Sequence, residues 1–192
     1  MSPRTDELPL IEPLDRNEWR SWLSANYDSS PGVWLAVGKK GNPRTSLSYG
    51  DAVEEAVRFN WIDSTTYRLD DHRFRQLFTP RKAGSTWSHS NKERVERLQA
   101  QGLLMPIAIA AIEAAKLDGS WNQLEDVENL VVPEDLAAAL AREPGAERGF
   151  HALSASQRKM ALYWIATAKR PETRQKRIAE TVRAAAEGRP PR

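Results

Sequence analysis

Apolar residues recur at helical spacing over most of the chain, and they alternate with polar residues in only three short stretches. Behind a capping box of Asp15 and Glu18, the residues Trp19, Trp22 and Leu23 fall at positions i, i+3 and i+4. This spacing predicts a helix whose inner face carries two indoles. The same periodicity predicts further helices behind capping residues or prolines, opening at Ser48, Ser90, Pro106, Pro133, Ser154 and Pro171.

The three alternating stretches are residues 33–40, 61–69 and 72–79, which we predict to be β-strands. The first has apolar residues in both alternations, so both of its faces should be covered. The other two should form an antiparallel hairpin, because only a short polar turn separates them. Such a hairpin would bring residues 61–63 beside residues 78–81 at its open end.

The loop of this hairpin is predicted at residues 70–71. A two-residue loop would place Tyr67 opposite Phe74, which is a favourable cross-strand aromatic pair. The same register would place Arg68 opposite Arg73, where two like charges repel. A longer loop, or an anion shared by the two arginines, is therefore the alternative.

Together these elements predict an α+β fold, in which a small, mostly antiparallel sheet is covered by helices and followed by a helical C-terminal part. A chain of 192 residues is long enough for one sizeable core, or for one core with a small helical annex. We expect a flexible arm over residues 1–14, an α+β core over 15–119, an acidic connector over 120–132, a helical part over 133–186 and a tail over 187–192.

The composition is that of an ordinary globular protein, with 28% charged and 40% hydrophobic residues. The absence of cysteine excludes disulfides, thiolate metal sites and thiol catalysis, and it fits a reducing compartment. The first residues contain no apolar run of signal-peptide length, and no later run approaches the ~20 apolar residues of a membrane span. A cytoplasmic protein is therefore expected.

Charge is distributed unevenly along the chain, although the net charge is only +2. From Ser154 to the end there are ten Lys or Arg and three Asp or Glu, whereas residues 112–147 contain nine acidic and two basic residues. This asymmetry favours attraction between these two segments, or between the basic segment and an acidic partner.

One stretch, FTPRKAGSTWSHSN at residues 78–91, combines more polar side-chain types than a surface loop requires. It follows the end of a predicted strand and leads into a predicted helix. Its cations Arg81 and Lys82 and its hydroxyl groups precede the free amides of a helix N-terminus, a combination typical of oxyanion sites.

This stretch also carries a resemblance to a known family. The segments AVRFNWID (56–63), FTPRKAGSTWSHSN (78–91) and ALYWIATAKRPETRQKRI (161–178) resemble the YdeI/OmpD-associated family of bacteriocin-protection proteins. The similarity covers roughly residues 19–190. It departs from the family pattern at Asn60, where Gly is expected, and at residues 104–106, which replace a more polar turn.

The resemblance implies a cytosolic bacterial protein linked to stress or to tolerance of bacteriocins and cationic peptides, with an outer-membrane porin as an associate. It implies no known reaction. From the residues themselves, a protein that captures cationic peptides should present an acidic surface. The acidic residues 112–147, and not the basic end, would then be the candidate surface.

We predict that the 78–91 stretch binds a small anion or an acidic segment of a partner protein. Asp63 could orient Arg81 across the hairpin mouth, and two indoles could stack on a planar group. The alternative is structural, with Arg81 and Asp63 as an ion pair, the serines as helix caps and both indoles in the core. The candidate ligand-binding residues are Trp61, Asp63, Arg81, Lys82, Ser85, Trp87, Ser88 and Asn91.

An enzyme acting on an anionic substrate in the same pocket is the second hypothesis. It lacks a nucleophile with a well-placed base, because Ser88 and His89 are adjacent and project in different directions from a helix start. None of His72, His89 and His151 has partners at zinc-ligand spacing. We therefore expect a non-enzymatic protein without a metal or cofactor.

Nucleic-acid binding is the third hypothesis. Arg170, Arg174 and Arg177 fall at positions i, i+4 and i+7 and form a basic stripe on the last predicted helix. That helix carries no aromatic residues on the same face to stack with bases. A solvated face, or docking on the acidic segment of the same chain, is the preferred interpretation of this stripe.

Overall fold

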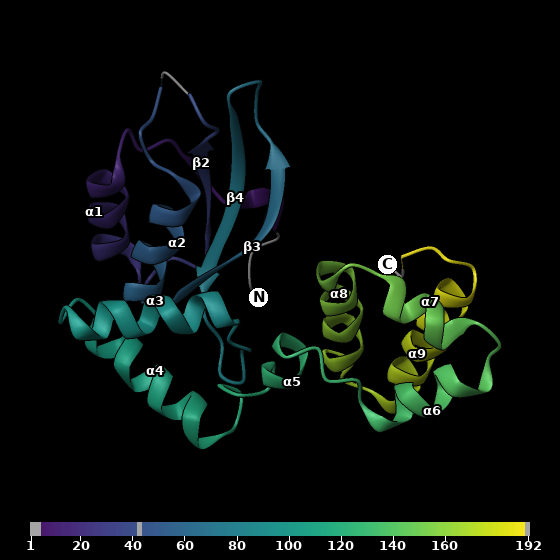
Figure 1. The fold of residues 1–192 in the computed structure, drawn as a ribbon. Coiled ribbons are helices and arrows are strands. Elements are labelled where there is room, and N and C mark those ends of the chain that lie inside the picture. The colour runs from purple at the N-terminus through teal and green to yellow at the C-terminus, as the bar shows by residue number, and fades with distance from the viewer. Residues whose placement is uncertain (1–4, 42–43, 191–192) are drawn as a thin grey trace. The chain divides into compact units, whose positions relative to one another are not determined.

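The computed structural model describes residues 5–41 and 44–190 and divides them into two compact units (Figure 1). The first unit contains the chain through Ser85 together with Ser90–Trp121. The second contains Thr86–His89 and the residues from Asn122 onward. A sheet covered by helices forms the first unit and helices alone form the second, which confirms the predicted α+β fold with a helical C-terminal part.

Among the residues that the structure describes, the sheet of the first unit has four strands in the order β1-β2-β4-β3. Its pairings are antiparallel except that β1 runs parallel to β2, so the prediction of a mostly antiparallel sheet is confirmed. The interior strand β2 is buried on both faces, as its continuous apolar sequence predicts. The bounds of the strands are β1 (Leu10–Ile11), β2 (Val33–Gly38), β3 (Trp61–Arg68) and β4 (Arg73–Pro80).

The segment expected as a flexible arm contributes to this sheet. Thr5–Glu7 form a short 3-10 helix (η1), and the following residues supply β1. The indole Nε1 of Trp34 donates a hydrogen bond to the carbonyl oxygen of Thr5 at 2.7 Å. A two-residue strand has no alternation to detect, so the sequence pattern could not show it.

The β3–β4 hairpin has the predicted register at its open end. Trp61 lies opposite Pro80, and Asp63 lies opposite Phe78. Residues 61–63 therefore adjoin the start of the 78–91 stretch, as predicted from the hairpin alone.

Near its loop the hairpin has a different register. A bulge after Asp63 shifts the pairing by one residue, so Tyr67 faces Arg75, and Arg68 faces Phe74. The predicted Tyr67–Phe74 pair is wrong, and the loop is longer than two residues. The shift also separates the two arginines that a two-residue loop would have placed opposite one another.

Helices α1 (Arg16–Asn26) and α2 (Tyr49–Arg58) cover one face of the sheet (Figure 1). Trp19 is fully buried, lies 5.4 Å from Phe78 between ring centroids, and donates from Nε1 to the carbonyl oxygen of Ala52 at 3.0 Å. One buried indole thus connects α1, α2 and β4. Its polar N–H is satisfied, which removes the cost of burying it.

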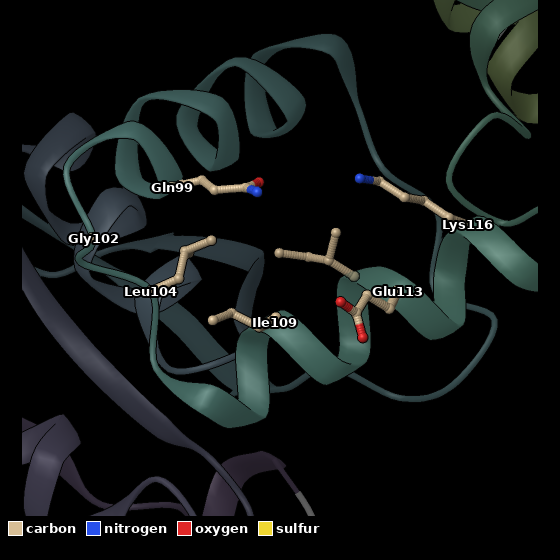
Figure 2. A pocket seen from close by; sticks show the side chains of 7 residues that line it. Gln99, Gly102, Leu104, Ile109, Glu113 and Lys116 are labelled. Atoms are coloured by element: carbon tan, nitrogen blue, oxygen red, sulfur yellow. The ribbon is translucent and has the colours of Figure 1, made fainter.

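Helices α3 (His89–Ala100) and α4 (Pro106–Leu117) lie side by side in Figures 1 and 2. Pro106 occupies the first turn of α4, as predicted. Helix α3 begins one residue before Ser90, so the prediction that Ser90 caps this helix is wrong. Its end near Gly102 is confirmed, because Gly102 has a φ of +65° and Leu103 donates from its backbone N–H to Leu98.

The second unit is built from five helices among its described residues, namely α5 (Glu125–Glu128), α6 (Glu134–Arg142), α7 (Ala146–Ala152), α8 (Ala155–Ala166) and α9 (Pro171–Ala186). The predicted capping box of Ser154 and Gln157 opens α8. Phe150, Ile165 and Leu136 are fully buried at the centre of its apolar core. Over residues 5–41 and 44–190, no helix is long and apolar enough to cross a membrane.

Candidate functional site

The predicted site residues are divided between the two units. Trp87 and Ser88 belong to the second unit, whereas the other six belong to the first. Lys82 is exposed and Ser85 is partly exposed, in a turn that closes through the Ser85 N–H and the Lys82 carbonyl oxygen at 3.1 Å. The geometry described below concerns the first unit, where Trp61, Asp63, Arg81 and Asn91 lie on elements that meet at the open end of the hairpin.

Trp61 is a core residue of the first unit. Its side chain is fully buried, and its Nε1 donates to the carbonyl oxygen of Tyr27 at 3.0 Å. Its ring meets that of Trp22 edge-on at 5.8 Å between centroids. This environment agrees with the structural interpretation of Trp61, in which the indole belongs to the core.

The residue before Trp61 is Asn60, at a position where the resemblance led us to expect glycine. Asn60 has a φ of +60°, in the left-handed region that glycine adopts without strain. Asparagine is among the few other residues that tolerate this conformation. The turn also brings the Asn60 carbonyl oxygen to the backbone N–H of Arg81 at 2.8 Å, so this backbone conformation helps position Arg81.

Arg81 is a buried cation at the hairpin mouth. Only 8% of the residue is exposed, and burial lowers the pKa of its guanidinium to about 10 while the Asp63 carboxylate opposes that change. Even at that value the side chain stays charged at neutral pH. Asp63 is at the same time a hydrogen-bond acceptor, because the Tyr49 hydroxyl donates to its Oδ2 at 2.6 Å.

Tyr49 is held in its protonated form by this arrangement. Burial raises the pKa of the Tyr49 phenol, and the hydrogen bond to Asp63 raises it further, while the positive charge of Arg94 acts in the opposite direction. The phenol therefore remains neutral at physiological pH. It fixes the Asp63 carboxylate through its hydrogen bond.

Arg94 adds a second cation to this cluster. It extends from the first turns of α3, where its Nη1 donates to the carbonyl oxygen of Ser90 at 3.0 Å and to Oδ1 of Asn91 at 3.4 Å. Asn91 itself is only 8% exposed. Arg94 acts on the Tyr49 phenol and Asp63 acts on Arg81, so both arginines bring positive charge to this part of the first unit, which favours an anion there.

Neither Tyr49 nor Arg94 was predicted from the sequence as a site residue. Tyr49 precedes Asp63 by fourteen residues on a different element, and only the packing of α2 against β3 brings the two together. Arg94 lies three residues after Asn91, one turn along a helix. Because residues three apart on a helix are neighbours, the predicted site residue Asn91 could have identified Arg94 from the sequence.

A second charged cluster joins α1 and α2 and was also missed. Glu55 is completely buried and accepts hydrogen bonds from three arginines. Arg16 Nε donates to Oε1 at 2.6 Å, Arg20 donates to both oxygens, and Arg58 Nη1 donates to Oε2 at 2.8 Å. Arg16 also reaches Glu54 at 2.7 Å. This Glu55 network has all its carboxylate contacts satisfied, so we interpret it as structural.

The network controls the ionisation of its carboxylates. Burial acts to raise the pKa of Glu55, but the hydrogen bonds from Arg20 and Arg16 outweigh it, and the pKa lies below its usual value. The pKa of Glu54 is lowered in the same way, with burial opposed by Arg16 and Arg97. Both groups are therefore charged at neutral pH.

Lys39 does not belong to the cluster at the hairpin mouth. Because β2 runs antiparallel to β4, Lys39 lies at the loop end of the hairpin. Its Nζ donates to the carbonyl oxygens of Asp70 and Asp71 at 3.4 and 3.2 Å.

The basic stripe predicted on the last helix makes contacts within the second unit. Arg174 forms a two-pronged ion pair with Asp135, with Nε–Oδ2 at 2.6 Å and Nη2–Oδ1 at 2.9 Å. Arg177 donates to the carbonyl oxygen of Trp164 and lies 5.3 Å from the centroid of that ring. Arg170 is the N-cap residue of α9. Arg174 therefore docks on an acidic residue of its own chain, in line with the preferred interpretation.

Two family models match the chain in succession. Residues 11–111 match the model described as a domain of unknown function (DUF8412). Residues 129–188 match the model described as bacteriocin-protection, YdeI or OmpD-associated. No curated protein and no solved structure matches the chain.

The first match spans more than half of the sequence, so the chain belongs to the DUF8412 family, and its residues 129–188 are similar to the YdeI/OmpD-associated model. The resemblance to the YdeI/OmpD-associated family is thereby confirmed for the C-terminal segment. The 78–91 stretch, on which part of that resemblance depended, lies within the other match.

Proposed function

We propose that this chain is a non-enzymatic binding protein whose first unit holds a small anion at the open end of the β3–β4 hairpin. The observation that carries this proposal is the buried guanidinium of Arg81, whose charge interacts with Asp63, while the charge of Arg94 acts on the Tyr49 phenol that holds the same carboxylate. An anionic group bound here would accept charge-assisted hydrogen bonds, which are about twice as strong as neutral ones.

The remaining groups of the cluster fit this role. Asp63 is held by Tyr49, which fixes the carboxylate in one position. Asn91 adds a side-chain amide in the first turn of α3. The protonated Tyr49 phenol supports binding rather than nucleophilic chemistry.

The wider role we propose is in stress or bacteriocin tolerance, as the description of the C-terminal family suggests. Direct capture of cationic peptides would use the acidic residues of the 112–147 segment, because the C-terminal segment is basic. The lack of cysteine is consistent with action in the cytoplasm. A porin contact would then be indirect or transient.

Inorganic phosphate and pyrophosphate are the probes for this proposal. A ligand that binds only the folded state raises the unfolding temperature with concentration. We expect both anions to stabilise the wild-type protein and to lose that effect in Arg94→Gln and in Arg81→Lys, which preserves the charge at the buried position. Arg68→Gln is the matched control, since Arg68 lies in the same hairpin at its opposite end and is exposed.

Equal stabilisation of Arg94→Gln and the wild type would contradict the proposed site. A peptide rich in Asp and Glu is the second probe. If that peptide bound and neither phosphate nor pyrophosphate did, the site would recognise an acidic partner segment instead of a small anion.

A further inference from the structure

A pocket between α3 and α4 has no role in the function proposed above. It has a volume of about 180 Å³ and lies entirely within the first unit (Figure 2). None of its lining residues belongs to the cluster at the hairpin mouth. The pocket is lined by Gln99, Gly102, Leu104, Ile109, Ile112, Glu113 and Lys116.

The inner part of the pocket is apolar. Leu104 and Ile109 extend into it from the α3–α4 turn and from α4 (Figure 2), and Ile112 is only 3% exposed. Ile109 is 44% exposed, which is high for an isoleucine on a helix that is apolar almost throughout. Apolar surface of this kind gains free energy when a ligand covers it.

The turn that carries Leu104 is fixed from two sides. Gly102 closes the end of α3 with a left-handed conformation, and the Leu103 N–H returns to Leu98 at 2.9 Å. Arg58 of α2 holds the same turn, because its Nε donates to the Leu103 carbonyl oxygen at 3.1 Å and its own carbonyl oxygen accepts from Met105 at 3.0 Å. A pocket wall held in this way loses little conformational entropy when a ligand binds.

The mouth of the pocket carries hydrogen-bond donors. The amide of Gln99 and the ammonium of Lys116 point toward one another across the pocket (Figure 2). Lys116 Nζ also lies 5.3 Å from the ring centroid of Trp121, and Lys92 Nζ lies 5.5 Å from the same centroid. The donors of Gln99 and Lys116 thus face the space that a head group would fill, and the positive charge of Lys116 favours an anionic one.

We propose that this pocket binds a small apolar carboxylate. The apolar body would contact Leu104, Ile109 and Ile112, and the two carboxylate oxygens would accept from Gln99 and Lys116. The volume is slightly larger than that of an apolar protein cavity of about 150 Å³ that accommodates benzene. A ligand the size of one ring with one carboxylate therefore fits.

Benzoate, benzamide and benzamidinium test the proposal, because they share one shape and differ in charge. We expect backbone amide shifts around Gln99, Gly102 and Ile109 on addition of benzoate, and at least about tenfold weaker binding of benzamide, which corresponds to one lost charge-assisted contact. Lys116→Glu should reverse the preference, so that benzamidinium binds more tightly than benzoate. Lys169→Glu makes the same charge change at an exposed position of the second unit and should leave benzoate binding unchanged.

Three results would overturn the proposal: equal binding of the three compounds, a preference unchanged in Lys116→Glu, or amide shifts located at the hairpin mouth. Arg94→Gln separates this site from the anion site, because it should leave benzoate binding intact. A measured mass of twice the monomer, with the same α4 amides protected, would assign the apolar face to a second copy of the chain instead.

Discussion

The two units of this chain are stabilised by different kinds of interior. The first unit buries polar and charged side chains together with its apolar core: Glu55 accepts from three arginines, and the indole N–H groups of Trp19 and Trp61 reach backbone carbonyls. Among its described residues, the second unit buries a single polar side chain, Thr181, whose hydroxyl donates to the carbonyl oxygen of Arg177 in its own helix.

The second unit depends instead on close helix packing. A Cβ atom added to Gly149 of α7 would lie 1.9 Å from the carbonyl oxygen of Ala185 in α9. Its ion pairs are at the surface, as Arg174 and Asp135 illustrate with side-chain exposures of 31% and 47%. The first unit should therefore be sensitive to the loss of a charge, and the second to the gain of a methyl group.

The largest effect should come from Gly149→Ala. Overpacking costs typically 1–3 kcal/mol, and we expect about 3 kcal/mol or more here because the neighbouring atom belongs to the backbone and cannot turn away. Amide hydrogen exchange should accelerate in α7 and α9 and stay unchanged in β4. Gly50→Ala in α2 is the matched control: its Cβ would meet only Ser48 Oγ at 3.8 Å, so it should be neutral or stabilising. Similar losses in both variants would contradict this difference between the units.

The next largest effect should come from Glu55→Ala. Removing one partner of a buried ion pair costs about 3–5 kcal/mol. We expect roughly 2–3 kcal/mol, because Arg16 and Arg20 are about one-third exposed and can regain water. Urea unfolding followed in α1 and α2 measures this loss of unfolding free energy. Asp135→Ala, which breaks the exposed pair of the second unit, should cost less than about 1 kcal/mol; a cost as large as that of Glu55→Ala would overturn the comparison.

The Glu55 network should also make the stability of the first unit depend on pH, with a smaller effect than that of Glu55→Ala. The folded-state pKa values of Glu54 and Glu55 are lowered, so their stabilisation is complete above the unfolded value of 4.5 and is lost as pH falls through the lower folded values. The pKa values of Glu128 and Asp135 in the second unit are lowered as well, but these groups are partly exposed whereas Glu55 is fully buried, so the first unit should lose more stability than the second in acid. Urea midpoints measured for each unit at pH 7 and pH 3.5 test this, with Glu55→Gln expected to remove most of the difference. An equal acid response in both units would exclude the network as its cause.

The smallest effect concerns the helix caps, for which the two units should behave alike. Ser154 caps α8, and Ser48 caps α2, each through a side-chain oxygen that accepts a backbone N–H. Substitution of either by alanine should cost about 1 kcal/mol, because a helix cap acts locally. Unfolding free energies of the two variants provide the measurement. A markedly larger loss at one of the two would show that this cap also supports tertiary packing.

The sequence predicted those features that depend on neighbouring residues. The capping box at Ser154, the proline start of α4, the glycine end of α3 and the open end of the hairpin follow from local rules of backbone geometry. In the candidate site, Asp63 and Arg81 were predicted together for the same reason, since the hairpin places them at one end.

Features that depend on distant residues were predicted incorrectly or not at all. The hairpin register near its loop changes at a bulge, which places Arg75 4.7 Å from the Trp34 ring and 5.3 Å from the Tyr67 ring. This favourable cation–π contact includes Trp34 of a third strand, β2, so it cannot be predicted from the two strands of the hairpin alone.

The sequence by itself therefore determined the order and type of most elements, though not of β1, α5 and α7, because hydrophobic period and capping act within a few residues. The tertiary structure alone decided that Tyr49 would hold Asp63, and that Glu55 would be buried among three arginines. The physical reason is that a buried charge is tolerated only where opposite charges from other elements converge on it. Such convergence is a property of packing, and local sequence patterns do not encode it.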